Sequence, residues 1–336
     1  MTTFSPYIRK PTSVRQVMLT VLIALVPGIA VYAWQIGAGI LVNLAIASLT
    51  AIAAEAVVLK LRGRPVLPAI GDLSAVLTAW LIALCFPTIA PWWITMIAVL
   101  IAIIVVKHLY GGLGQNPFNP AMVAYCSMIV AFPSLMSQWP PAGGLDFQTQ
   151  LDLILGGARN IDAITGATAL DALRTGLRSG ETTVGSILQQ SAFGALGGRG
   201  WEWLGLGYLV GGILLLSRRV ITWHMPVAFL VTLATIATLF WLVNPAKFAS
   251  PLFHLASGGA MLAAFFIVTD PVTGATTPRG KLIFAAGVAL LAYLIRTFGA
   301  FPEGIAFAVL LMNLCVPIID MKSQPAVFGH KGGRQP

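Results

Sequence analysis

The stretch VMLTVLIALVPGIAVYAW, residues 17–34, decides the fold class, because 18 consecutive residues carry no charged side chain. A helix of about 20 such residues crosses the hydrocarbon core of a bilayer. The stretch is longer than the apolar region of a signal peptide, which has about 7–15 residues, and a second apolar stretch follows almost at once. We therefore predict that residues 17–34 form a retained membrane-spanning helix.

The rest of the chain repeats this pattern. Hydrophobic residues make up 57% of the 336 residues and charged residues 9%, whereas a soluble domain carries about 25% charged residues. The composition predicts an all-α polytopic membrane protein with about ten transmembrane helices. The ten predicted spans are Val17–Trp34, Ile36–Leu59, Leu67–Ala90, Trp92–Val106, Ala121–Leu135, Trp203–Leu216, Ile221–Val243, Leu252–Thr269, Leu282–Ile295 and Ile305–Ile319.

The distribution of lysine and arginine predicts the orientation, because basic residues in short loops stay on the cytoplasmic side. With both termini inside, 14 of the 20 basic residues are cytoplasmic and 6 are outside. The net charge of +9 is therefore mainly an orientation signal, and its spread over many loops argues against nucleic-acid binding. The inner residues are Arg9, Lys10, Arg15, Lys60, Arg62, Arg64, Lys107, Arg218, Arg219, Arg279, Lys281, Lys322, Lys331 and Arg334, and the outer residues are Arg159, Arg174, Arg178, Arg199, Lys247 and Arg296.

A weak internal repeat divides the chain into two halves. SAVLTAWLIALCFP (74–87) resembles GAMLAAFFIVTDP (259–271), and KHLYGGLGQNPFNPAMVAY (107–125) corresponds in position to RTFGAFPEGIAFAVLL (296–311). Five spans per half give the two copies opposite topology. Inverted repeats of this kind place a binding site or pathway near the middle of the membrane, where helices are interrupted by glycine and proline.

The predicted organisation has four parts. A first five-helix repeat covers 1–136, a periplasmic loop covers 137–200, a second five-helix repeat covers 201–320, and a cytoplasmic tail covers 321–336. The interruptions GGLGQNPFNP and FGAFPEG are candidates for irregular backbone at membrane depth. Their alternative interpretation, as ordinary surface loops, stays open.

Ionisable residues near the spans are candidates for an ion pathway, because a charge in hydrocarbon is costly. We favour Asp270 and Glu303, since each adjoins a proline and an interrupted element. The isolated Cys85, Cys126 and Cys315 form neither a disulfide framework nor a metal motif, and we assign them structural roles. The weaker pathway candidates are Glu55, Asp72, His108, His224 and His254.

The pattern Asp-x-x-Thr-Gly-Ala-Thr occurs twice, in DAITGATAL (162–170) and in DPVTGATTP (270–278). The predicted topology places Thr168 in the outer loop and Thr276 in a cytoplasmic link. A small-residue loop leaves either hydroxyl accessible, so the side of the membrane distinguishes the two threonines.

The chain resembles the family that contains the D subunit of the Rnf electron-transport complex and, more distantly, the B subunit of the Na⁺-translocating NADH:quinone reductase. The resemblance covers most of the sequence. The motifs that carry it are DAITGATAL (162–170), KHLYGGLGQNPFNPAM (107–122), TDPVTGATTPRGKLIF (269–284), FPEGIAFAVLLMNLCVPIID (301–320) and VFGHKGG (327–333).

This resemblance implies a covalent flavin. In the family, a flavin transferase attaches FMN through a phosphodiester bond to the last threonine of the outer-loop motif. Carried over by position, the acceptor is Thr168, and Asp162, Thr165, Gly166 and Ala167 form the recognition sequence. Thr165 stands where serine is common in the family. Thr276 is then a chance match.

The resemblance also implies the function. The chain is expected to be an inner-membrane subunit that relays electrons through FMN while an assembled Rnf-type complex moves Na⁺ or H⁺, with NADH or ferredoxin oxidised on partner subunits. A second, non-covalent flavin site is left open. The alternative is a small-solute channel of the urea-channel kind, because an inverted ten-helix repeat also builds such channels. DAITGATAL favours the redox function, since a channel needs no flavin acceptor.

Overall fold

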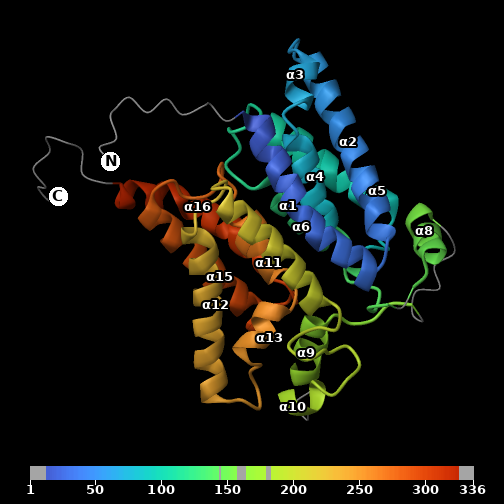
Figure 1. Ribbon diagram of the computed structural model, residues 1–336, viewed down its shortest axis with the longest axis vertical. Helices are drawn as coiled ribbons and strands as arrows, with labels where there is room; N and C mark the ends of the chain where they lie inside the picture. Colours follow the sequence, from blue (N-terminus) through green and yellow to red (C-terminus); the bar gives the residue numbers. More distant parts are fainter. Residues whose placement is uncertain (1–12, 144, 157–163, 179–182, 325–336) are drawn as a thin grey trace, which may run out of the picture.

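The computed structural model describes residues 13–143, 145–156, 164–178 and 183–324, and the described part of the chain forms helices and no β-strand beyond isolated bridges. Among these described residues, five helices are long and apolar enough to cross a membrane. This confirms an all-helical polytopic membrane protein (Figure 1). The five helices are α1 (Val14–Gln35), α2 (Gly39–Leu61), α12 (His224–Val243), α15 (Pro278–Phe298) and α16 (Ile305–Ser323).

Shorter apolar helices lie at four further predicted spans. One of them changes character along its length, because α5 (Trp92–Leu100) continues without a break into the π-helical segment η1 (Ile101–His108). π-Helical turns are uncommon and frequently occur at functional sites. The other three are α4 (Ser74–Cys85), α6 (Pro120–Ala131) and α11 (Trp201–Ser217).

Two of the predicted spans are interrupted at a residue with positive φ, and a third, Ala121–Leu135, is divided at Phe132 into α6 and α7 (Pro133–Met136). Leu67–Ala90 is divided into α3 (Val66–Ile70) and α4, because Leu73 adopts a left-handed conformation with φ 65°. Asp72 stabilises the new helix start, since its Oδ1 accepts hydrogen bonds from the Ser74 backbone N–H at 2.7 Å and from Ser74 Oγ at 2.5 Å.

The second interruption falls in Leu252–Thr269. This segment is divided into α13 (Pro251–Ala256), α14 (Ala260–Leu262) and the π-helical η3 (Ala263–Ile267). Gly258 forms the break with φ 64°, a backbone conformation that glycine adopts without steric cost. Both interruptions therefore have a local backbone cause that mean hydropathy does not show.

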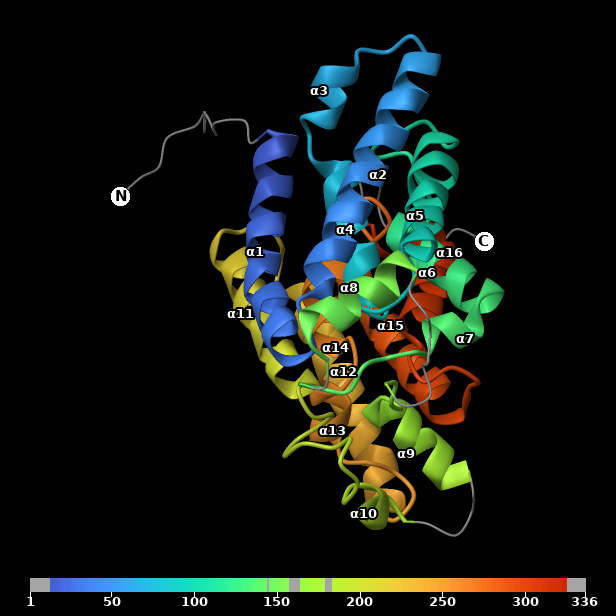
Figure 2. The same cartoon turned by 90° about the vertical axis from the view of Figure 1, so that its right-hand side faces the viewer.

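The predicted outer loop contains short helices. They are α8 (Phe147–Leu155), α9 (Ala169–Arg178) and α10 (Val184–Ile187), and α7 (Pro133–Met136) precedes them. Figures 1 and 2 both show α9 and α10 at one end of the molecule near α13, and α3 at the opposite end. α9 and α10 are joined to the helical body by a small apolar cluster, which consists of Ala169, Leu170, Leu173, Val184, Ile187, Phe193, Ala249 and Phe253.

Close helix packing joins the two halves of the chain. α1 runs along α11 (Figure 2), and small residues let their backbones meet. A Cβ atom at Gly207 would lie 2.9 Å from the Cα atom of Gly28, and one at Gly211 would overlap the carbonyl oxygen of Ala24. Glycines four residues apart on one face are typical of tightly packed membrane helices.

Candidate functional site

Thr168 lies at the beginning of α9. The preceding segment is attached to the body by the Gly166 N–H, which donates to the carbonyl oxygen of Trp139 at 3.0 Å. Gly166 and Ala167 are exposed, and Thr168 is half-buried. The Thr168 Oγ1 accepts from the backbone N–H of Asp171 at 3.3 Å, so the threonine caps the helix.

The other predicted motif residues divide into two groups. Thr165, Gly166 and Ala167 are adjacent to Thr168 in the described segment 164–178. Asp162, the first residue of the motif, lies outside the described residues.

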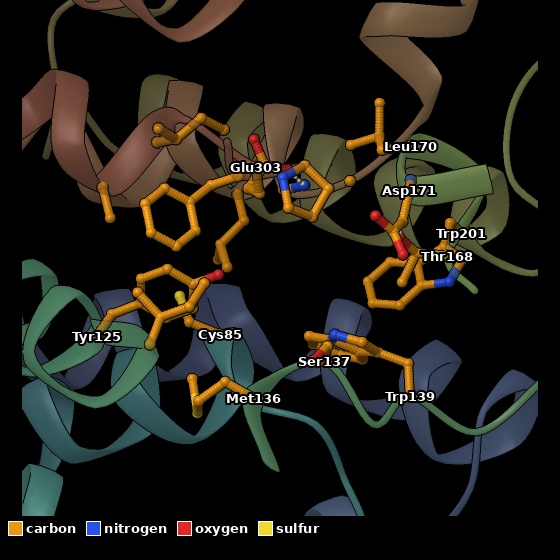
Figure 3. Close-up of a pocket in the computed structure, with 18 of the residues that line it drawn as sticks. Cys85, Tyr125, Met136, Ser137, Trp139, Thr168, Leu170, Asp171, Trp201 and Glu303 are labelled. Carbon is orange, nitrogen blue, oxygen red and sulfur yellow. Dashed lines mark hydrogen bonds between the residues drawn. The ribbon is translucent and has the colours of Figure 1, made fainter. Parts of the chain in front are cut away.

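A cavity of about 350 Å³ opens beside Thr168, and we call it the Thr168 cavity. Figure 3 shows Thr168, Trp139 and Trp201 grouped on one side of it, and Tyr125 and Cys85 on the other. The Trp139 and Trp201 rings meet edge to face with centroids 5.2 Å apart. The walls are thus mainly apolar and aromatic, as is typical of small-molecule sites.

Charged groups occupy two separate parts of the Thr168 cavity. Close to Thr168, Arg174 donates from Nη2 to Asp171 Oδ1 at 3.0 Å and from Nη1 to the carbonyl oxygen of Ala300. The Arg174 Nε is buried and has no hydrogen-bond partner within the described residues. Away from this group, Glu303 lines the cavity and forms an ion pair with Arg296 at 2.7 Å.

Asp270 lies elsewhere, in a second cavity of about 400 Å³ that we call the Asp270 cavity. Its Oδ2 accepts from Thr273 Oγ1 at 2.7 Å and lies 3.5 Å from the Asn119 side-chain nitrogen. Lys107 lines the same cavity. The two predicted pathway residues, Asp270 and Glu303, are therefore not brought together.

Each of the two predicted interruptions contributes to a different cavity. GGLGQNPFNP supplies Asn116 and Asn119 to the Asp270 cavity, and FGAFPEG supplies Phe301 and Glu303 to the Thr168 cavity. Each interruption thus supplies part of a cavity wall.

The two motif threonines occupy different cavities. Thr276 lines the Asp270 cavity, and its Oγ1 donates to Asp320 Oδ2 at 2.9 Å. Ser74, the first residue of α4, lines the Asp270 cavity, and Cys85, the last, lines the Thr168 cavity. With a rise of about 1.5 Å per residue, the two cavities lie at opposite ends of a helix about 18 Å long.

The sequence did not single out the tryptophans of the Thr168 cavity. Trp139 and Trp201 stand at the two ends of the polar segment 137–200, and this placement is a signal that would have identified them. Their contact across 62 residues depends on the tertiary fold, as does the contact of Arg174 with the Ala300 carbonyl oxygen.

Comparisons with known proteins match nearly the whole length of the chain. The model of the NQR2, RnfD, RnfE family matches residues 1–329. The D subunit of the ion-translocating oxidoreductase complex of Yersinia pseudotuberculosis serotype O:1b (strain IP 31758) is 47% identical over 348 residues, covering 98% of this chain and 99% of the relative. Proteins with the same name are 47% identical in Salmonella paratyphi A (strain ATCC 9150 / SARB42) and 45% identical in Erwinia tasmaniensis, each covering 98% of both chains.

Proposed function

Since this chain belongs to the NQR2, RnfD, RnfE family, we propose that Thr168 carries covalently attached FMN and that the chain relays electrons through it. The chain is a membrane subunit of an ion-translocating oxidoreductase complex, and other subunits of that complex are its partners. The observation that carries the flavin proposal is the position of the Thr168 hydroxyl at the edge of an aromatic cavity.

The surroundings of Thr168 fit a phosphodiester. The exposed Gly166 and Ala167 leave the motif accessible to a flavin transferase. A phosphate on Thr168 would lie at the N-terminus of α9, where free backbone N–H groups and the helix dipole favour negative charge. The Nε of Arg174, which has no hydrogen-bond partner among the residues that the structure describes, offers a further donor at this end of the cavity.

The Thr168 cavity also fits a flavin ring. Its volume of about 350 Å³ lies in the range of about 300–1,000 Å³ that is typical of small-molecule sites. Trp139 and Trp201 would exclude water from the ring near Thr168, and Tyr125 and Phe301 add aromatic surface to the cavity wall. The bound flavin would supply one- and two-electron chemistry, whereas Thr168 anchors it and takes no part in proton transfer.

We extend the proposal to the architecture and location. The chain forms two inverted five-helix repeats in the inner membrane, with the loop that carries Thr168 in the periplasm. The interrupted segments that contain α4 and α14 support the repeat, because they fall at corresponding positions of the two halves. The Asp270 cavity, about 400 Å³ in volume, has the size for a second, non-covalent flavin.

Ion movement is assigned to the assembled complex. Asp270 and Glu303 are the proposed pathway residues on this chain for Na⁺ or H⁺, each at a separate cavity. A solute channel, the alternative that the sequence left open, is not proposed, because the relatives are named as subunits of an oxidoreductase complex over nearly their full length.

The test of covalent attachment uses the full chain produced together with a flavin transferase. The wild-type protein should give a fluorescent band on a denaturing gel, Thr168→Ala should lose it, and Thr168→Ser, which keeps a hydroxyl, should retain it at least in part. Thr276→Ala is the matched control and should keep full fluorescence. Mass spectrometry of the tryptic peptide Asn160–Arg174 locates the added mass. A full-strength band from Thr168→Ala would refute the assignment.

A further inference from the structure

Three charged residues line the Thr168 cavity within the described part of the chain, and one of them stands apart. Asp171 and Arg174 pair with each other next to Thr168. Glu303 comes from the link between α15 and α16, and Figure 3 shows it away from Thr168 and Asp171. A carboxylate at this place is not needed to anchor a phosphodiester, so any role of Glu303 toward the flavin, in addition to the proposed ion pathway, requires a separate explanation.

The Glu303 carboxylate is held in one position by two hydrogen bonds and an ion pair. Its Oε1 accepts from Arg296 Nε at 2.9 Å and lies 2.7 Å from Arg296 Nη2, and its Oε2 accepts from the Gly259 N–H at 2.9 Å. A Cβ atom on the neighbouring Gly258 would collide with Glu303 Oε2, so that glycine permits the close approach. The carboxylate is thus held in place through both of its oxygens.

The partner cation lies behind the carboxylate. The Arg296 side chain is 1% exposed and that of Glu303 is 22% exposed, and only Glu303 lines the cavity. Arg296 is further tied down by its Nη1, which donates to the carbonyl oxygen of His254 at 3.0 Å. A group bound in the cavity therefore lies closer to the negative charge of Glu303 than to the positive charge of Arg296. The guanidinium reduces the effect of the carboxylate without cancelling it.

We propose that Glu303, positioned by Arg296, sets the reduction potential of the flavin carried on Thr168. This inference rests on the proposed function. One electron taken from an external reductant adds one negative charge to the contents of the cavity, and no bond of the chain forms or breaks. The negative charge of a fixed carboxylate beside the ring repels the added electron and so lowers the reduction potential, and the positive charge of Arg296 partly offsets this repulsion. Both effects are strongest where little water screens the charges.

Charge and structure can be separated by the choice of variants. Glu303→Gln removes the charge but keeps the size and an oxygen that accepts a hydrogen bond. Glu303→Asp keeps the charge and shortens the side chain. Glu202→Gln is the matched control, because the Glu202 carboxylate also holds a loop, accepting from the Leu196 N–H at 3.0 Å, yet it does not line the cavity.

The experiment is a spectroelectrochemical titration of the purified full chain with its covalent flavin. We expect Glu303→Gln to raise the ratio of reduced to oxidised flavin at least tenfold at a fixed potential, which corresponds to about 59 mV for a one-electron couple. For Glu303→Asp and Glu202→Gln, the ratio of reduced to oxidised flavin should stay within about threefold of the wild-type ratio. This corresponds to a change in potential of at most about half of that expected for Glu303→Gln. Arg296→Gln, which leaves the carboxylate uncompensated, should shift the potential in the opposite direction.

The outcomes separate this inference from the function on which it rests. A Glu303→Gln protein that keeps the fluorescent band and the wild-type potential overturns the role of Glu303 and leaves flavin attachment intact. The same shift in Glu202→Gln also overturns it, since the effect would then be non-specific. Absence of flavin from the wild-type chain refutes the proposed function and this inference together. Thermal unfolding of each variant confirms the fold, and the Glu303 variants decide the question if Arg296→Gln does not fold.

Discussion

Lys107 Nζ lies 2.5 Å from Glu55 Oε1, and both side chains are 4% exposed. The lysine also donates to Ser74 Oγ at 2.8 Å, and the Nε2 of His108 lies 3.4 Å from the same carboxylate oxygen. Lys107 and His108 belong to η1, Glu55 to α2 and Ser74 to α4. Three helical segments are therefore joined at the edge of the Asp270 cavity, η1 and α2 by the buried ion pair and α4 by the hydrogen bond from Lys107 to Ser74.

Glu55→Gln should destabilise the protein, because it leaves the buried Lys107 ammonium without a counter-charge. Loss of one partner from a buried pair costs about 3–5 kcal/mol, whereas replacement of both by apolar residues is often nearly neutral. The double variant Glu55→Leu with Lys107→Met should therefore unfold at a higher temperature than Glu55→Gln alone. Thermal unfolding in detergent measures both, and equal stability of the single variant and wild type would contradict the importance of the pair.

The sequence predicted the long helices well. The observed ends of α1, α2, α12, α15 and α16 fall within a few residues of the predicted spans. The reason is that a helix satisfies every backbone hydrogen bond within a single apolar stretch, and that is required where no water is present. Mean hydropathy is averaged over a window of residues, however. It therefore did not predict the helix breaks at Leu73 and Gly258, which depend on the backbone conformation of single residues.

The candidate site was less predictable than the fold. The motif around Thr168 was found because it is a local pattern of adjacent residues. Contacts such as Lys107 with Glu55, which are 52 positions apart, depend on how helices pack, and a single sequence carries no signal for them. Asp270 and Glu303 were selected for the same reason, a neighbouring proline, yet they line different cavities.

Gly211→Ala should destabilise the contact between α1 and α11. The added methyl group would overlap the carbonyl oxygen of Ala24, and overpacking of this kind costs about 1–3 kcal/mol. Gly205→Ala on the same helix is the matched control, because its Cβ would lie 3.5 Å from Met261 Cγ, an ordinary contact. Thermal unfolding should show a lower midpoint for Gly211→Ala only. If both variants lose stability alike, the cause is not the close approach to α1.

Helix α8 should lose protection in acid. Hydrogen bonds from Thr149, first from its hydroxyl and then from its backbone N–H, lower the pKa of Asp146, which caps this helix. The folded-state pKa of Asp146 lies below the unfolded value of about 3.9. The ionised cap therefore stabilises α8 fully above the unfolded pKa, and this stabilisation is lost as the pH falls through the folded-state pKa. Hydrogen exchange, corrected for the intrinsic rate, should show weaker protection at pH 3 than at pH 6.

Asp146→Ala provides the comparison for that experiment. Without the carboxylate, protection of α8 should be low at both pH values, and its pH dependence should disappear. The loss of hydrogen-exchange protection should extend to the start of α2, because the side-chain oxygen of Gln150 in α8 accepts a hydrogen bond from the Gly39 N–H at 2.9 Å. A wild-type pH dependence that persists in Asp146→Ala would assign it to another group.

Two serines test the sidedness on which the proposed attachment depends. Ser186 is exposed in α10, in the predicted periplasmic loop, and Ser217 is exposed at the end of α11, next to Arg218 in a predicted cytoplasmic link. In a background with the three native cysteines replaced, Ser186→Cys should react with a membrane-impermeant maleimide in intact cells, and Ser217→Cys only after permeabilisation. The reverse pattern would put Thr168 on the cytoplasmic side, beyond the reach of a periplasmic transferase, and would make Thr276 the accessible acceptor.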